Sequence, residues 1–532
     1  MTFSDDFRLG TVADPHLLLA FDGTDIPGWL GQRLRDEPPS GVTLFRELNS
    51  TSPDQVAQMT SDLQRLNASD IPLLIAIDQE GGQLLGLVGS TPFAGNMALG
   101  ATGDADLTYR VAHAMGVELA AVGVNVNYAP VVDVATEPSN PSLGVRSLGD
   151  DPHAVAMLSE AFVRGFEDAG IRTSAKHFPG KGEAAVDPHY ELPVLGMTRE
   201  RFDSVELAPF KAAFAAGASL LMVGHYVAPA LTGDNDTPTP ASYRAITEVL
   251  RGDLGFSGLV VTDALDMGAL DQGETQVVEI IAMMRAGVDL LLCMPDRSLE
   301  TRVRAAVNRG YARGLISQET LSTSRKRIAE VRRSTRIGQL DPSAVSSAEH
   351  RAVADELAER SITLVRNDAG VLPLTVSPDS RILCVEPTPT NVTPADTTAL
   401  YPASLADSVA AVHPDVVGIV YPHLPAGSDI HGIVSAASDV DVVIVGTVAA
   451  GSEQAALVNA LIATGKPVVT VAMRTPFDLA HYPDATTHIC TYSSLEPSVR
   501  ALVSAMFGRT TFTGRLPAAI PGLYPTGHGS SL

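Results

Sequence analysis

The sequence predicts an α/β protein, with an N-terminal TIM-like (β/α)8 barrel followed by a smaller α/β sandwich domain. Over residues 1–335, short apolar runs alternate with amphipathic, alanine-rich stretches, and this unit occurs eight times. Apolar strands that alternate with helices indicate a parallel sheet covered on both faces. After residue 352 the pattern changes to a smaller set of similar units. An open, doubly wound sheet is the alternative for the first domain.

Each barrel strand is predicted from a run rich in leucine or β-branched residues that ends in polar residues. The runs are LLLAF (17–21), VTLF (42–45), LLIAI (73–77), VNVNYAP (124–130), TSAKHF (173–178), SLLMVGH (219–225), LVVTD (259–263) and VDLLLCM (288–294). Eight such units in about 300 residues fit a closed barrel.

A linker is predicted at 336–352, where the chain is small, polar and contains proline. The second domain, 353–532, alternates RILCV (381–385), DVVGIVY (415–421), DVVIVGTV (441–448) and PVVTVAM (467–473) with helical stretches such as EQAALVNALIATG. Its GTVAAGSE segment is neither a GxGxxG motif nor a P-loop, so we assign it no nucleotide.

The composition limits the partners and the compartment. With 61 acidic against 37 basic residues, the net charge of −24 disfavours nucleic acid and anionic membranes. The chain begins acidic, without the basic start of a signal peptide, which predicts a cytoplasmic protein. Cys293, Cys384 and Cys490 form no CxxC pair and are expected to be buried thiols in a reducing compartment.

Charged or titratable residues follow every predicted barrel strand. They are Asp22, Arg46, Asp78, Asp133, Lys176 with His177, His225, Asp263 and Asp296. Active sites of such barrels lie at the carboxyl ends of the strands. We therefore expect one polar pocket assembled from several loops.

Asp263 ends an almost wholly apolar strand, where a carboxylate must be hydrogen-bonded, charge-paired or functional. It caps a helix expected over ALDMGAL (264–270), or it is a nucleophile or electrostatic stabiliser facing the barrel mouth. Asp78 would grip neighbouring sugar hydroxyls from LLIAIDQEGG (73–82), where twin glycines allow close backbone approach. Arg146 lies in a loop framed by glycine and proline, which suggests a shaped binding loop.

The stretch AKHFPGKGEAAVDPHY (175–190) carries two further candidates. His189 lies on a loop, and Asp187 can hold its ring nitrogen, raise its basicity and fix its tautomer. This pair suits general acid/base catalysis, although exposed loop histidines are common. His177 follows Lys176 at the end of a buried strand, so it either faces the substrate rigidly or is a satisfied core histidine.

These motifs, in order, resemble glycoside hydrolase family 3, in its bacterial β-N-acetylglucosaminidase branch. The segments that carry the resemblance are LLIAIDQEGG, NYAPVVDV, NPSLGVRSLGDDP, AKHFPGKG…DPHYELP, MVGH, VVTDALDMGAL, SITLVRND…LPL and FGRTTFTGRLP. The KHFPG…DxH combination separates this branch from the β-glucosidases of the family, whose acid/base is a carboxylate from elsewhere.

The resemblance implies a retaining, exo-acting enzyme that removes terminal β-linked N-acetylglucosamine from cell-wall or chitin fragments. Asp263 would be the nucleophile, His189 the acid/base and Asp187 its orienting partner. Asp78, Arg146, Lys176, His177 and His225 would hold the sugar. No metal and no cofactor are implied.

Three positions depart from the pattern of the branch. Lys181 stands in PGKG where the branch has PGHG, and Gln83 and Gly86 follow DQEGG where the branch has arginines. One contact to a sugar hydroxyl is therefore missing or is supplied by another residue. The departures bear on affinity and on leaving-group preference.

Several alternatives remain open from the sequence. Phosphate could replace water as acceptor, because a histidine acid/base does not repel an anion and Lys181 lies in the same loop. The set His177, His189, His225, Asp78 and Asp263 could ligate zinc, and a non-catalytic sugar-binding module is also conceivable. The substrate's 2-acetamido group could act as nucleophile, but Asp266 is expected inside a helix and pointing away.

Overall fold

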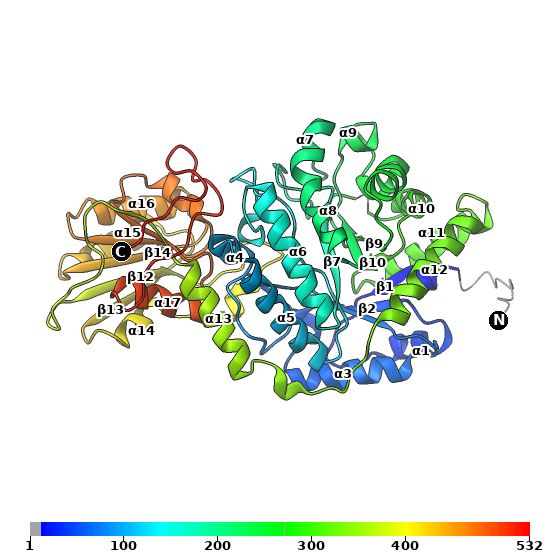
Figure 1. Cartoon of the computed structure of the whole chain (residues 1–532), viewed down its shortest axis with the longest axis horizontal. Coiled ribbons are helices and arrows are strands. Elements are labelled where there is room, and N and C mark those ends of the chain that lie inside the picture. The colour runs from blue at the N-terminus through cyan, green and yellow to red at the C-terminus, as the bar shows by residue number, and fades with distance from the viewer. Residues whose placement is uncertain (1–11, 271) are drawn as a thin grey trace.

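The computed structural model describes residues 12–270 and 272–532, and it divides into a barrel domain and a second, sheet-centred domain (Figure 1). The barrel strands lie in the order β10-β1-β2-β3-β6-β7-β8-β9, and all their pairings are parallel. Their bounds are β1 Leu17–Leu19, β2 Gly41–Leu44, β3 Leu74–Ile77, β6 Val126–Asn127, β7 Arg172–Phe178, β8 Leu220–Val223, β9 Leu259–Thr262 and β10 Leu291–Cys293. A parallel bridge from Val261 to Leu290 joins the two ends of this sheet. The predicted barrel is thus confirmed, and the open sheet is excluded.

The barrel strands are covered on both of their faces. Every residue of β2, β3, β8 and β9 is buried. Inside the barrel, Leu18, Leu74, Met222 and Val261 belong to one packed apolar cluster, so the interior is a core and not a channel. The chemistry must therefore lie at the rim, where polar residues follow the strands.

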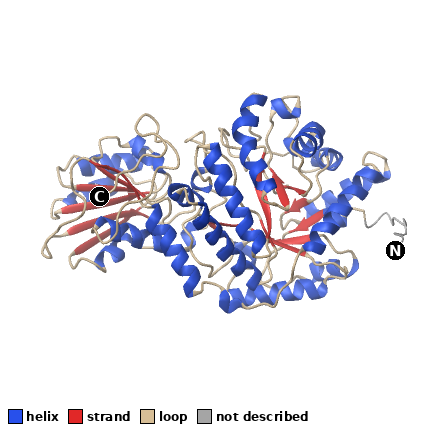
Figure 2. Cartoon of the chain, viewed as in Figure 1, coloured by secondary structure: helices blue, strands red, loops and turns tan. Residues whose placement is uncertain are grey.

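Helices surround this barrel, as Figure 2 shows in blue. They are α1 Gly28–Asp36, α2 Arg46–Asn49, α3 Pro53–Leu66, α4 Asn96–Thr102, α5 Ala105–Ala121, α6 Pro152–Asp168, α7 Arg199–Arg201, α8 Leu207–Ala215, α9 Pro229–Thr232, α10 Gln276–Ala286, α11 Arg297–Ala312 and α12 Gln318–Ser334. A further helical segment spans Arg244–Asp253, and a small hairpin pairs β4 Gln79–Gly81 with β5 Leu84–Leu85. The side chains of Ser52, Asp104 and Asp151 cap α3, α5 and α6 by accepting backbone N–H bonds.

The second domain is built on a six-stranded sheet in the order β11-β16-β15-β14-β12-β13. Its strands are β11 Thr363–Asn367, β12 Ile382–Pro387, β13 Val416–Tyr421, β14 Val442–Thr447, β15 Val468–Ala472 and β16 Thr487–Cys490, and only β11 is antiparallel to its neighbour. Its helices are α13 Ala348–Ser361, α14 Leu405–Ala410, α15 Gly427–Ala437, α16 Ser452–Ile462 and α17 Glu496–Met506. The four apolar runs predicted as strands form β12 to β15, and α13 begins inside the range predicted as a linker.

Three further observations concern the expectations about compartment and membrane. Cys293, Cys384 and Cys490 are all buried and unpaired. Within the described residues, no helix is both long and apolar enough to cross a bilayer. The acidic start of the chain, on which the prediction of no signal peptide rests, falls within residues 1–11 and lies outside the described part of the chain.

Candidate active site

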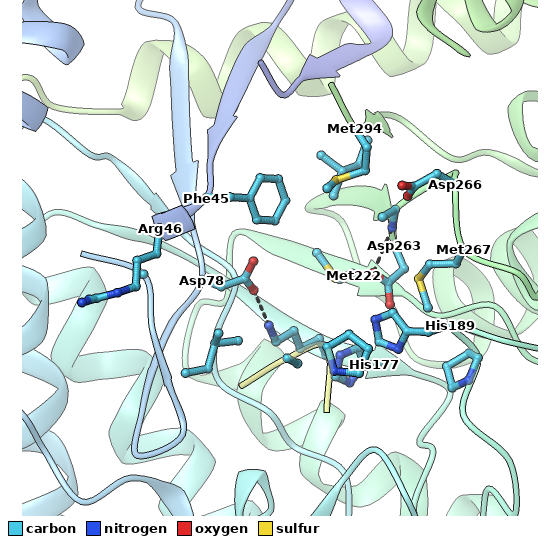
Figure 3. A pocket seen from close by; sticks show the side chains of 18 of the residues that line it. Phe45, Arg46, Asp78, His177, His189, Met222, Asp263, Asp266, Met267 and Met294 are labelled. Atoms are coloured by element: carbon cyan, nitrogen blue, oxygen red, sulfur yellow. Dashed lines mark hydrogen bonds and ion pairs between the residues drawn. The ribbon is translucent and has the colours of Figure 1, made fainter. Parts of the chain in front are cut away.

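A pocket of about 400 Å³ opens at the carboxyl ends of the barrel strands. Its lining includes six of the predicted site residues, namely Asp78, Arg146, Lys176, His177, His189 and Asp263. Figure 3 shows Asp78 on one side of this pocket and Asp263, with His189, on the other. Apolar side chains such as Phe45, Met222 and Met294 complete the walls. The structure therefore brings most of the predicted residues to a single cavity.

A buried ion network forms the Asp78 side of the pocket. Lys176 Nζ lies 2.6 Å from Asp78 Oδ1 and 2.6 Å from Glu80 Oε1. Arg146 grips the same Glu80 with two donors, at 2.9 Å from Nε and 2.8 Å from Nη2. Although burial opposes it, the charges of Arg146 and Lys176 lower the pKa of Glu80 to about 2. Glu80 thus fixes two cations at the pocket, and sequence reasoning assigned it no role.

Lys176 and His177 are consecutive yet both face the pocket. In a regular strand, neighbouring side chains point to opposite faces. The pairing of β7 with β8 shifts register between Ala175 and Phe178, so the backbone departs from regular alternation at these two residues. This local irregularity explains how one strand end supplies two pocket residues, and periodicity alone does not reveal it.

His177 is held from behind by a buried carboxylate. Its Nδ1 donates to Asp133 Oδ2 at 2.8 Å, and its Nε2 lies 3.3 Å from Arg146 Nη2. Burial and the charges of Lys181 and Arg146 lower the pKa of His177 well below its usual range. His177 is therefore a neutral imidazole with a fixed tautomer, suited to binding and poorly suited to proton donation.

The predicted pair on the loop after β7 is formed. His189 Nδ1 lies 2.6 Å from Asp187 Oδ1, which also accepts the His189 backbone N–H at 3.0 Å. Although burial opposes it, these bonds lower the pKa of Asp187, so that it stays ionised. The imidazole keeps about 30% of its side chain exposed, which leaves Nε2 able to reach a ligand in the pocket.

The base of this loop is packed tightly. Asp133 Oδ1 accepts the Lys181 backbone N–H at 2.9 Å, and Asn140 donates to the Lys181 carbonyl at 2.7 Å. A Cβ at Gly182 would lie 1.9 Å from the Val134 carbonyl oxygen, and one at Gly180 would meet Glu206. Both glycines therefore allow close approach of the backbone, in addition to any freedom they give the loop.

Asp263 lies at the rim where β9 ends, and Asp263 Oδ1 accepts the N–H of Ala264 at 2.9 Å. The helix expected over 264–270 is wrong, because these residues form turns and the next helix, α10, begins at Gln276. Asp263 is therefore not a helix cap. The expectation that Asp266 points away is also wrong, since Asp266 lines the same pocket. Loss of solvent and the nearby Asp263 charge raise the pKa of Asp266.

Lys181 also lines the pocket and is 2% exposed. Its ammonium makes one long hydrogen bond, 3.4 Å from Nζ to the Ser142 carbonyl. Burial and the charge of Arg146 lower the pKa of Lys181 to about 8, against the attraction of Asp133 and Asp263. A weakly satisfied buried ammonium is available for a polar or anionic ligand.

Four of the strand-end residues lie elsewhere, and one of them, Asp133, is buried behind His177. His225 is fully buried and does not line the pocket, and its Nε2 donates to the Ala264 carbonyl at 3.0 Å, behind Asp263. Asp22 is exposed outside the pocket. Asp296 caps α11, accepting the Ser298 N–H at 2.7 Å. The expectation that every strand-end residue lines one polar pocket is therefore wrong for Asp22, Asp133, His225 and Asp296. Polar residues after strands also cap helices and turns or support neighbouring side chains.

Within residues 12–270 and 272–532, no three His, Cys, Asp or Glu side chains are grouped so that they could hold a metal ion. Three of the five residues considered for zinc are engaged elsewhere, Asp78 with Lys176, His189 with Asp187 and His177 with Asp133. The other two contact the backbone of Ala264, His225 at the carbonyl and Asp263 at the N–H. The carboxylate and carbonyl oxygens that accept hydrogen bonds from these histidines account for the orientation of the rings.

Family models match both domains. The N-terminal domain of glycosyl hydrolase family 3 matches residues 32–331, and the C-terminal domain of that family matches residues 362–523. The chain belongs to glycosyl hydrolase family 3. The resemblance stated from its motifs is thereby confirmed.

Curated relatives in the family include a beta-hexosaminidase A from Pseudoalteromonas piscicida, 36% identical over 66% of this chain. A beta-N-acetylglucosaminidase/beta-glucosidase from Cellulomonas fimi is 32% identical over 68% of this chain. The match spans 63% of the first relative and 65% of the second, a little under two thirds of each.

Solved structures of the family share the whole architecture. A family 3 beta-N-acetylglucosaminidase from Paenibacillus sp. str. FPU-7 has a TM-score of 0.89 and 32% identity, covering 97% of this chain and 99% of that one. A beta-glucoside phosphorylase has a TM-score of 0.80 at 25% identity, covering 97% and 94%. Both domains of the family 3 fold are therefore present in this chain.

Proposed function

We propose that this family 3 protein is a retaining, exo-acting β-N-acetylglucosaminidase. The observation that carries the proposal is the pocket shared by Asp263 and the His189–Asp187 pair. A carboxylate and a histidine oriented by an aspartate provide a nucleophile and a proton donor. The names of the Pseudoalteromonas, Cellulomonas and Paenibacillus relatives support N-acetylglucosamine as the sugar.

In the first step, the Asp263 carboxylate forms a bond to the anomeric carbon while the bond to the leaving oxygen breaks. His189 Nε2–H gives its proton to that oxygen, and Asp187 stabilises the ring through Nδ1–H. In the second step, the neutral His189 takes a proton from water, whose oxygen attacks the same carbon and releases Asp263. One histidine thus does the work of the second carboxylate found in most retaining glycosidases.

The ion network provides the sugar-binding side of this proposal. Asp78 Oδ1 accepts from the Lys176 ammonium at 2.6 Å, and Asp78 Oδ2 and the remaining N–H groups of Lys176 offer an acceptor and donors to sugar hydroxyls. Arg146 and the neutral His177 extend the polar wall. Since Asp133 and Glu80 hold them rigidly, little entropy is lost when the sugar binds.

The alternative in which the 2-acetamido group is the nucleophile gains support from Asp266. This second carboxylate lines the pocket three residues after Asp263. A slow 2-fluoro sugar distinguishes the two routes, because it traps a covalent adduct only if Asp263 attacks carbon. A tight thiazoline inhibitor with no adduct would favour substrate assistance.

Phosphorolysis is a second candidate function, and Lys181 is the observation that favours it. Its buried ammonium has one long hydrogen bond and lies in the pocket, where it could attract a phosphate acceptor. The structural similarity to a beta-glucoside phosphorylase is compatible with this reaction.

The test measures cleavage of an aryl β-N-acetylglucosaminide with and without inorganic phosphate, and identifies the sugar product by mass. Free N-acetylglucosamine under both conditions supports hydrolysis. N-acetylglucosamine 1-phosphate, formed faster than the free sugar, would support phosphorolysis. No turnover of any aryl N-acetylglucosaminide would contradict both proposals and favour a binding module.

A further inference from the structure

The substrate pocket has one wall that comes from the second domain. Pro394, Ala395 and Thr397 line the pocket, although they follow β12 of the C-terminal sheet. All the other lining residues belong to the barrel domain. The pocket is therefore a composite of two domains that are far apart in sequence.

Gln83 fixes this wall to the barrel through both its backbone and its side chain. Its carbonyl accepts the Thr397 N–H at 2.7 Å, and its Nε2 donates to the Ala395 carbonyl at 2.6 Å. Its Oε1 accepts from Arg474 Nη2 at 2.6 Å, and Arg474 also pairs with Asp396. The three side chains are buried, and a buried network with its partners satisfied is rigid.

The wall is also held by hydrogen bonds within its own segment and by a contact between Tyr401 and the barrel domain. Asp396 accepts the backbone N–H groups of Val392 at 3.0 Å and Thr398 at 2.9 Å. Farther along the chain, the Arg46 guanidinium lies 4.3 Å from the centre of the Tyr401 ring. The segment 392–401 is thus a preformed part of the site.

The strand order places the wall relative to the chemistry. In the closed barrel, three strands separate β3 from β9 in either direction, so Asp78 and Asp263 follow strands on opposite sides. Gln83 follows the same β3 strand as Asp78. A sugar with its anomeric carbon at Asp263 and its hydroxyls at Asp78 therefore turns its non-reducing end toward the wall.

We propose that the segment 394–397 closes the pocket beyond the non-reducing end of the bound sugar and so restricts the enzyme to terminal residues. This inference rests on the proposed function for the orientation of the sugar. It also assigns a role to Gln83, which replaces an arginine of the bacterial branch: Gln83 is a positioning residue that joins the two domains. Gly86 leaves no room for a side chain there, since a Cβ would lie 2.5 Å from the Asp78 carbonyl oxygen.

The experiment compares an aryl β-N-acetylglucosaminide with the aryl glycoside of β-1,4-linked di-N-acetylchitobiose. Wild-type enzyme should release free N-acetylglucosamine from the disaccharide first, so that the aryl group appears after a lag. Gln83→Leu, which loosens the wall, should release the aryl group without a lag. The amount of intact disaccharide detected by mass should be about tenfold higher than with the wild-type enzyme. Unchanged order of release in a folded Gln83→Leu enzyme would overturn the proposal.

A second variant tests the wall without loosening it. Ala395→Trp should enlarge the wall and raise KM for the monosaccharide substrate about tenfold, with kcat changed much less. Leu400→Trp, a matched change at an exposed position of the same segment, should leave KM unchanged. Equal KM values for the two variants would overturn the wall while leaving the proposed function intact. Wild-type protein that neither cleaves the aryl substrate nor binds N-acetylglucosamine would overturn both.

Discussion

The Nδ1 atom of His189 lies 2.6 Å from Oδ1 of Asp187, and the same oxygen accepts the His189 backbone N–H. A carboxylate held at this position keeps Nδ1 protonated and leaves Nε2 to exchange protons with the substrate. The geometry of one short loop segment thus sets the direction in which a proton can move.

His189→Ala should slow substrates with poor leaving groups far more than activated aryl glycosides, because only poor leaving groups need a proton. We expect kcat/KM to fall by about 100-fold or more for an alkyl or sugar leaving group, and by less than about tenfold for a nitrophenyl group. Measuring kcat/KM across leaving groups of graded pKa checks this. Added azide should restore part of kcat for the activated substrate by replacing water in the second step.

Asp187→Ala should follow the pattern of His189→Ala more weakly, since the ring remains but loses its orientation. Equal losses for every leaving group in His189→Ala would instead indicate that His189 only binds substrate. In that case His177 would become the candidate, although Asp133 and its burial hold it neutral.

Asp263→Ala should retain less than about one hundredth of wild-type kcat, because the covalent step loses its nucleophile. Each tenfold loss of rate corresponds to ~1.4 kcal/mol of lost transition-state stabilisation. Asp296→Ala is a matched control at another strand end, where the carboxylate caps α11 outside the pocket. It should keep its activity and lose about 1 kcal/mol of stability. Circular dichroism checks that each variant is folded. If a slow 2-fluoro sugar forms its covalent adduct in the wild-type enzyme on a residue other than Asp263, the assignment of Asp263 as nucleophile is refuted.

Glu80→Gln should destabilise the folded protein by roughly 3 kcal/mol, because two buried cations lose their shared counter-charge. Since the pKa of Glu80 is lowered to about 2, its stabilising effect is complete above the unfolded value near 4.5 and is lost as pH falls toward 2. The difference in Tm between wild type and variant should therefore shrink across that window. Asp62→Asn, which removes the exposed pair with Arg65, should change Tm little at any pH.

The sequence was most informative about features that depend on a single short segment of the chain. Continuous apolar runs located every barrel strand, and the D-x-H spacing located the His189 pair, because these signals are local. The turn after β9 was mistaken for a helix, and Asp266 was misplaced with it, because ALDMGAL has helix-forming residues but folds into separate turns closed by i→i+3 hydrogen bonds. Local propensity is a weak guide when tertiary contacts determine a loop.

The contacts between domains were not predictable in this way. Gln83 and Arg474 are 391 residues apart, and nothing near either residue indicates the other. Glu80 was visible in the DQEGG motif, but its role depends on Arg146, from the loop after β6, and on Lys176, from β7. Asp133 likewise gains its role only through contact with His177.

Lys181→Met should stabilise the protein below pH 8, because within the described residues the buried ammonium makes only one hydrogen bond, and that bond is long. Burial and the charge of Arg146 lower the pKa of Lys181 to about 8, whereas the ordinary value that applies in the unfolded chain is 10.5. Between these values the unfolded chain binds a proton that the folded protein does not, so wild-type stability should rise with pH across the window, by at most roughly 3 kcal/mol. The Tm advantage of the variant should therefore be largest at pH 7 and narrow toward pH 10. Lys211→Met, at an exposed helical position, should show no such trend.

A Lys181→Met variant less stable than wild type at pH 7 would mean that Asp133 and Asp263 stabilise the ammonium more than burial destabilises it. If Lys181→Met is more stable than wild type, then Lys181 lowers the stability of the folded protein and is explained by ligand binding. The variant should then have a higher KM for the sugar substrate or for phosphate.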